Sequence, residues 1–133
     1  MTWIKPQVAN MEAMPRVFLA VSHLETRSAF RLLLLDLRMQ VVGEAADWLA
    51  VLTEAFGTQP DMVVVDWDMI PTDSSLVELR ATCPAAVVIV LVSHLSARQQ
   101  AALSAGADSF ISKSETADRV AGRLRAAAES IRA

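Results

Sequence analysis

Two runs of consecutive apolar residues constrain the fold of this chain more than any other feature. The first lies within 61–66, where two aspartates flank Met-Val-Val-Val. The second covers 86–92, which is apolar throughout. A strand that is apolar at every position needs cover on both faces, which is typical of parallel sheets. Amphipathic segments with helical spacing separate these runs. The sequence therefore predicts an α/β fold, with a parallel sheet between two layers of helices.

Strand and helix are expected to alternate five times along the chain. The predicted strands cover 16–21, 40–44, 61–66, 86–92 and 109–112. Helices are expected after the cap at Ser22, at 47–57, as a short helix from Ser75, and at 96–106 and 116–131. Apolar stripes define the buried helix faces, namely Phe30, Leu33, Leu34 and Leu37, then Trp48, Val51, Leu52, Ala55 and Phe56, then Val120, Leu124, Ala127 and Ile131. Ser22 with Glu25 and Ser75 with Glu78 match the capping box, Asp47 is a candidate N-cap, and Gly57 is a candidate stop signal.

Composition narrows the class of protein. The 133 residues suit one domain, and an apolar content of 53% excludes a disordered chain. The net charge of -3 argues against nucleic-acid binding. The single cysteine, Cys83, allows no internal disulfide and favours a reducing cytoplasm. The apolar run at 85–92 is too short to span a membrane. We expect residues 1–15 to be an extension and 16–133 to be the folded domain.

The topology also predicts where a site should lie. In open parallel sheets, ligands bind outside the carboxyl ends of the strands. The predicted strand ends are 21–23, 66–68, 92–94 and 112–113. These segments carry Asp66, Asp68 and Lys113, a set suited to phosphoryl or metal chemistry.

The residues at these strand ends resemble those of a response regulator receiver domain of the CheY-like type. The stretch 60–69 is similar to the strand that bears the phosphoacceptor aspartate of that family. The stretch 105–113 is similar to the last strand, with its lysine and its switch aromatic, and 16–27 and 41–46 match the opening elements. The resemblance implies a flavodoxin-like, three-layer sandwich with strand order 2-1-3-4-5.

The resemblance also implies roles for individual residues. Asp66 would accept a phosphoryl group, Lys113 would contact the phosphate, and Phe110 would be the switch aromatic. The family holds Mg²⁺ beside the phosphoacceptor, because a cation must offset the charge that develops during phosphoryl transfer.

The sequence departs from the family at the metal site. The two acidic positions at the end of the first strand fall on Val21 and Ser22, which supply no carboxylate. We therefore expect Mg²⁺ binding to be weak or absent, with Asp66 and Asp68 as the remaining metal ligands and Glu25 as a poorer substitute. The switch hydroxyl position falls on Val92, although the adjacent Ser93 would serve if the strand end is offset by one residue.

Three alternatives remain open at this stage. The chain could be a pseudo-receiver that acts by binding alone. It could be a phosphatase of the haloacid dehalogenase type, with Asp66 and Asp68 in an Asp-x-Asp motif, although Thr72 is poorly placed for that motif. Finally, His23 and His94 could join the two aspartates in a transition-metal site.

The family resemblance implies signalling partners rather than an enzymatic role. A histidine kinase or another signalling protein would be the partner. The helix expected at 96–106, the strand at 109–112 and the helix at 116–131 would form the output face. The alanines at 101–102 and 126–128 would permit close approach of the helices in a homodimer. The arginines of the last helix alternate with acids and indicate a solvated face.

Overall fold

The architecture is a parallel sheet of five strands. The computed structural model describes residues 14–72, 74–93 and 106–132. The strands are β1 (Arg16–Ala20), β2 (Gln40–Ala45), β3 (Met62–Asp66), β4 (Val87–Val92) and β5 (Ser109–Ser112). Their order in the sheet is β2-β1-β3-β4-β5, and every neighbouring pair is parallel. The predicted α/β class and the predicted strand order are both confirmed.

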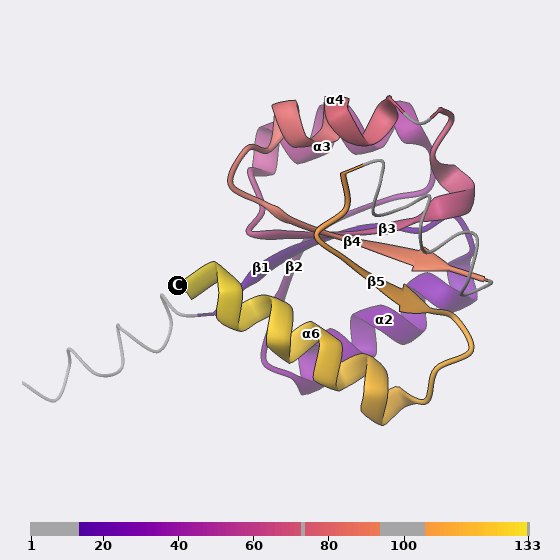
Figure 1. Ribbon diagram of the computed structural model, residues 1–133, viewed down its shortest axis with the longest axis vertical. Helices are drawn as coiled ribbons and strands as arrows, with labels where there is room; N and C mark the ends of the chain where they lie inside the picture. The colour runs from indigo at the N-terminus through magenta and orange to yellow at the C-terminus, as the bar shows by residue number, and fades with distance from the viewer. Residues whose placement is uncertain (1–13, 73, 94–105, 133) are drawn as a thin grey trace, which may run out of the picture.

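Helices cover both faces of the sheet. α3 (Trp48–Thr58) and α4 (Ser75–Thr82) lie on one face, and α2 (Leu24–Asp36) and α6 (Ala117–Arg132) lie on the other (Figure 1). A short 3-10 helix, η1 (Trp67–Met69), follows β3 directly. The predicted helix at 96–106 falls outside the described residues except for Gly106. Among the helices described, none is long and apolar enough to cross a membrane.

The core consists of two clusters, one on each side of the sheet. Alternate strand residues contribute to each, so Phe18, Val63 and Val65 pack beneath α3 and α4, whereas Leu19 and Val64 pack on the side of α2 and α6. This alternation explains the runs of consecutive apolar residues, because each strand needs apolar side chains on both faces. The predicted stripes of α2 and α6 lie in the second cluster, in line with expectation.

The helix starts were predicted with mixed success. Asp47 caps α3, since its Oδ1 accepts a hydrogen bond from the Ala50 N–H at 2.9 Å. Both capping boxes were wrong. The N-cap of α2 is His23, and the N-cap of α4 is Ser74, and neither makes a side-chain cap. Ser22 lies one residue outside its helix, and the buried Ser75 turns back to accept the Thr72 N–H at 3.2 Å.

Two predictions for α3 were also wrong. Gly57 does not end the helix, which continues to Thr58 with Gln59 as its left-handed C-cap at φ 45°. The Gln59 side chain favours this end, because its Nε2 donates to the Phe56 carbonyl at 2.9 Å and to the Thr82 carbonyl at 3.0 Å. Phe56 was assigned to the buried face but is 68% exposed.

Candidate functional site

Among the acidic residues that the structure describes, Asp66 is the most deeply buried. It ends β3, whose residues are all buried, and it is itself 1% exposed. Its Oδ1 accepts a hydrogen bond from the Asp68 N–H at 3.0 Å, which caps η1. A buried carboxylate is costly unless it is paired, so this position requires a partner cation.

Lys113 provides that cation. It directly follows β5, and its backbone N–H donates to the Val92 carbonyl at 2.9 Å, which extends the ladder between β4 and β5. Its Nζ lies 2.7 Å from Asp66 Oδ2 and 3.5 Å from Asp68 Oδ2. Asp66 Oδ2 is buried without a hydrogen bond of good geometry, so the ammonium ion is what balances its charge. The fold therefore brings together the two residues for which the sequence predicted a joint role.

The end of β1 carries an aliphatic side chain in this site. Ala20 pairs with Val65 in the sheet, so Val21 follows on the level of Asp66. Val21 is fully buried, whereas Ser22 is exposed. The first-strand edge of the site thus offers backbone carbonyls and one hydroxyl, and no negative charge.

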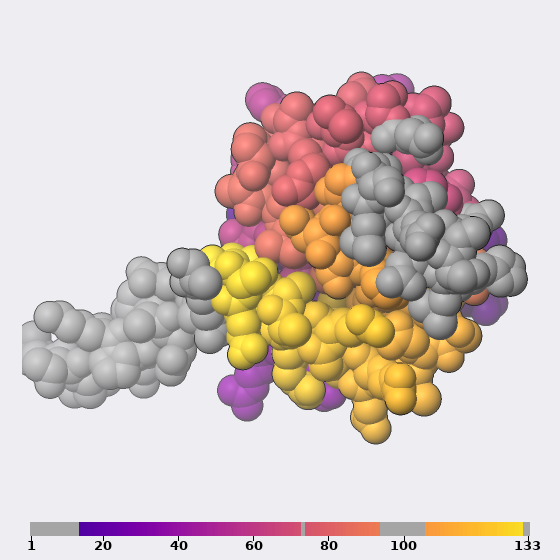
Figure 2. Space-filling view, in the orientation of Figure 1, coloured from indigo at the N-terminus to yellow at the C-terminus, as the bar shows by residue number. Residues whose placement is uncertain are grey.

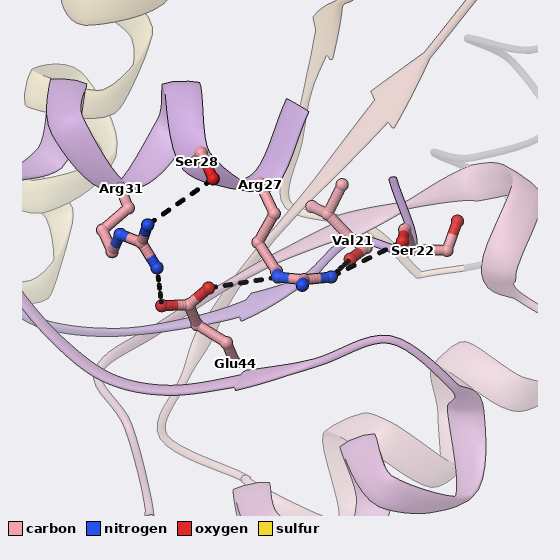
Figure 3. A network of polar contacts seen from close by, with 6 residues as sticks. All are labelled: Val21, Ser22, Arg27, Ser28, Arg31 and Glu44. Atoms are coloured by element: carbon pink, nitrogen blue, oxygen red, sulfur yellow. Dashed lines mark hydrogen bonds and ion pairs between the residues drawn. The ribbon is translucent and has the colours of Figure 1, made fainter. Parts of the chain in front are cut away.

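An arginine binds those carbonyls (Figure 3). Arg27 Nη1 donates to the Val21 carbonyl at 2.8 Å and, at 3.5 Å, to the Ser22 carbonyl. Its Nε lies 3.1 Å from Glu44 Oε1 on β2, and Arg31 Nη1 lies 3.0 Å from Glu44 Oε2. A guanidinium group therefore ties the end of β1 to the neighbouring strand, next to the candidate site.

The predicted switch positions differ in burial. Val92 is fully buried, and Ser93 is exposed. Phe110 is partly buried against the cluster beneath α3 and α4, and the guanidinium carbon of Arg123 lies 5.2 Å from the centre of its ring. This distance suits a cation–π contact.

Glu115 holds that arginine in place. Arg123 Nε lies 3.0 Å from Glu115 Oε1 and 2.9 Å from Oε2, and Oε1 also accepts the Ser112 N–H at 2.9 Å. Burial opposes the ionisation of Glu115, but the Ser112 hydrogen bond and the charges of Arg123 and Arg119 together lower the pKa of that carboxyl below its usual value.

The described residues near Asp66 offer two carboxylates to a metal, and a lysine already contacts both. Mg²⁺ binds through oxygen ligands, usually with one or two carboxylates. Asp66 and Asp68 are the acids at this edge, and Lys113 is paired with both. Glu25 is exposed at the start of α2. Within 14–72, 74–93 and 106–132, no group of three His, Cys, Asp or Glu residues could hold a metal. His23 is exposed, and His94 lies outside the described residues.

Sequence reasoning missed several residues that shape the site: Arg27, Glu44, Glu115 and Arg123. Arg27 and Glu44 lie on different elements, and nothing in the local sequence links them. The spacing of eight residues between Glu115 and Arg123 is compatible with a contact across the start of a helix, but such spacings are common.

Comparison with known proteins supports the resemblance. No protein-family model matches the chain. The response regulator protein VraR of Staphylococcus epidermidis is 30% identical over 90 residues, which make up 65% of this chain and 43% of that protein. The match therefore spans less than half the length of this relative.

Solved structures share the architecture. A two-component response regulator of the LuxR family from Aurantimonas sp. SI85-9A1 has a TM-score of 0.79 at 25% identity, with 88% of this chain and 86% of that chain covered. The receiver domain of the sensor histidine kinase PA1611 from Pseudomonas aeruginosa PAO1 has a TM-score of 0.75, with 87% and 98% covered. That structure has a magnesium ion coordinated in its active site cleft, and at 16% identity the likeness concerns the fold alone.

Proposed function

We propose that this chain is a CheY-like response regulator receiver domain, which signals through protein–protein contacts with Asp66 as its phosphoacceptor. One observation carries the proposal: a carboxylate that is 1% exposed lies 2.7 Å from a lysine ammonium at the strand-end edge of the sheet. A buried ion pair is weak evidence for a purely stabilising role, because desolvation offsets much of its attraction.

The chemistry follows from this pair. In the proposed reaction an Asp66 carboxylate oxygen attacks the phosphorus of a phosphorylated donor. The new P–O bond forms as the bond to the donor's leaving group breaks, and that group departs with the electron pair. Lys113 would then place its point charge against the phosphoryl oxygens instead of against Asp66. The modification would add a charge of roughly -1.5 to -2 at this edge.

We propose that the reaction with metal-dependent donors is slow in this chain. Val21 and Ser22 supply no carboxylate, so a divalent ion would depend on Asp66 and Asp68, which already interact with Lys113. A pseudo-receiver that binds partners without phosphorylation is the second candidate. The full burial of Val21 and Val92 favours it, because both are aliphatic where the family resemblance implies polar groups.

The partner is proposed to be a histidine kinase or another cytoplasmic signalling protein. A groove of about 430 Å³ between α2 and the β5–α6 turn gives such a partner access beside Lys113. We place the receiver at residues 16–133, after an extension at 1–15. A homodimer would use the face of β5 and α6, which lie next to each other on the molecular surface in Figure 2.

Intact-mass spectrometry tests the proposal. The protein is incubated with acetyl phosphate, with and without Mg²⁺, and its mass is compared with that of Asp66→Asn and Asp68→Asn variants. We expect a slow gain of one phosphoryl group that Asp66→Asn abolishes and Asp68→Asn retains. An unmodified mass under all conditions would reject Asp66 as a phosphoacceptor and would favour the second candidate, a pseudo-receiver that binds partners without phosphorylation. A gain that persists in Asp66→Asn would place the modification elsewhere.

A further inference from the structure

The side chains around Phe110 link the ring to the turn that follows β5. We propose that Glu115 and Arg123 form a latch, here called the 115–123 latch, that makes the position of the Phe110 ring respond to the charge on Asp66. The inference rests on the proposed function in taking Asp66 as the signalling site, but it does not require that phosphorylation is fast.

The first link of the latch runs from Asp66 to the turn after β5. The Lys113 ammonium lies 2.7 Å from Asp66, and the backbone of the same residue is anchored to Val92 at 2.9 Å. Ser112, the preceding residue, is 1% exposed. Its N–H donates to Glu115 Oε1 at 2.9 Å, so the carboxylate of Glu115 is tied to the backbone next to Lys113.

The second link runs from Glu115 to the aromatic ring. The Glu115 side chain is 10% exposed, and both of its oxygens lie within 3.0 Å of Arg123 Nε. Arg123 is 39% exposed, and its guanidinium lies over Phe110. A charge-assisted bond to an almost buried carboxylate fixes the direction of a long, flexible side chain better than a solvent-exposed contact does.

The latch crosses the edge of the sheet. Val120 and Leu124 of α6 pack in the cluster on the α2 and α6 side of the sheet. Phe110 packs in the cluster on the opposite side, beneath α3 and α4. Arg123 therefore reaches around the edge strand β5 to meet a ring that belongs to the opposite face. A displacement of the turn at Ser112 would move Glu115, and with it the cation that covers the ring.

The residue at position 92 explains why such a link matters here. The resemblance implies that a hydroxyl near this position joins the phosphoryl group to the switch aromatic, but Val92 is a buried aliphatic residue. A path connects the same two places: the Lys113 side chain contacts Asp66, the backbone leads to Ser112, and polar contacts continue through Glu115 to Arg123. Coupling between sites requires an element with two arrangements, and here these are the ring covered by Arg123 and the ring released from it.

Fluorine NMR on the intact chain tests the latch. 4-Fluorophenylalanine is introduced in place of Phe110, and the resonance is recorded with and without Asp66→Asn, which removes the charge that holds Lys113. The same pair of spectra is then recorded in an Arg123→Met background and in an Arg125→Met background. Arg125 is an exposed arginine on the same helix and serves as the matched control.

We expect Asp66→Asn to move the resonance by more than its line width in the otherwise unchanged chain and in Arg125→Met. In Arg123→Met, at least half of this displacement should be lost, and Glu115→Gln should behave in the same way as a second, independent break. Such a cycle isolates the coupling from the separate effect of each substitution. Because the measurement uses Asp66→Asn rather than a phosphoryl donor, it can succeed even if mass spectrometry shows no phosphorylation.

Two outcomes would overturn the latch. An equal displacement in Arg123→Met and in the unchanged chain would mean that the ring senses Asp66 by another route. A resonance that ignores Asp66→Asn in every background would mean that the ring does not sense Asp66 at all. Far-ultraviolet circular dichroism of each variant shows that the fold is intact before either conclusion is drawn.

Discussion

At the scale of single residues, the ion pair between Asp66 and Lys113 is asymmetric. Asp66 is 1% exposed, whereas the side chain of Lys113 is 26% exposed. If Asp66 is neutralised, the lysine can turn towards water. If the lysine is removed, the carboxylate remains buried without its counter-ion. Loss of one partner of a buried pair is costly because of the charge that it leaves behind.

We therefore predict that Lys113→Met destabilises the fold more than Asp66→Asn does. Lys113→Met should lower the free energy of unfolding by about 2–3 kcal/mol, at or just below the roughly 3–5 kcal/mol range for broken buried pairs, since the site borders solvent. Asp66→Asn should cost about 1 kcal/mol or less. Urea denaturation of both variants and of the double variant measures this. Equal costs would show that Asp66 is solvated more than its burial indicates.

Glu115 gives a prediction about pH. Its pKa lies below the ordinary value of 4.5 in the folded chain, so ionised Glu115 stabilises the fold above that value. The contribution is lost as the pH falls through the lowered pKa. The stability difference between the unchanged chain and Glu115→Gln should thus be constant around neutral pH and should shrink in acid. Urea denaturation from pH 7 to pH 3 measures it, and a difference that grows in acid would contradict the assignment.

Some of these residues were accessible to sequence reasoning, and others were not. Asp66 and Lys113 could be predicted, because each directly follows a strand and strand ends converge at one edge of a parallel sheet. Arg123 could not, because its partner Phe110 belongs to the opposite face of the sheet. The sequence predicts which face a residue of an element occupies, but not that a long side chain reaches around an edge strand.

At the scale of elements, Arg27 joins α2 to two strands. It contacts the end of β1 through the Val21 carbonyl and β2 through Glu44, and its side chain is 17% exposed. Arg31 shares Glu44 from one turn further along α2, but it is 44% exposed. The two arginines thus offer a matched comparison between a nearly buried guanidinium and a surface one.

We predict that Arg27→Met costs more stability than Arg31→Met. Loss of Arg27 leaves the Val21 carbonyl without this donor at a largely buried position, which should cost about 1–3 kcal/mol. Arg31→Met should cost less than about 0.5 kcal/mol, as is usual for exposed pairs. Thermal unfolding of both variants measures the difference. Equal small losses would show that the β1–α2 junction does not depend on Arg27.

Element positions were easier to predict than element ends. The strands were found from their apolar runs, which bury both faces and leave little choice of register. The ends were wrong at Ser22, Ser75 and Gly57, because a cap depends on where the chain turns, and a shift of one residue changes which side chain meets the free N–H groups. Gln59 ends α3 in place of Gly57, and its long-range contact with the Thr82 carbonyl leaves no local signal.

At the scale of the whole molecule, the missing acids predict that the fold gains little stability from divalent metal. A ligand that binds only the folded state stabilises it by RT ln(1 + L/Kd), where L is the free ligand concentration. If Mg²⁺ binds with a Kd of about 10 mM or weaker, about 10 mM Mg²⁺ adds no more than about 0.4 kcal/mol.

The free energy of unfolding should accordingly be the same, within about 0.4 kcal/mol, with Mg²⁺ and with sodium chloride of equal ionic strength. Urea denaturation followed by tryptophan fluorescence measures it; the chain has three tryptophans, and one of them, Trp67, directly follows Asp66. A gain of about 1.4 kcal/mol or more would indicate a Kd near 1 mM and a working metal site.

The interior of the sheet sets a limit on how any signal can travel through this molecule. The residues of β1, β3 and β4 that fill the two clusters are aliphatic or aromatic, apart from Asp66 at the very end of β3. A close-packed hydrocarbon interior resists compression and holds no charges to redistribute. A charge change at Asp66 would therefore pass around the periphery, along polar side chains that link one loop to the next. In this fold the apolar centre would not transmit such a change, and the polar rim of the sheet is the path left for it.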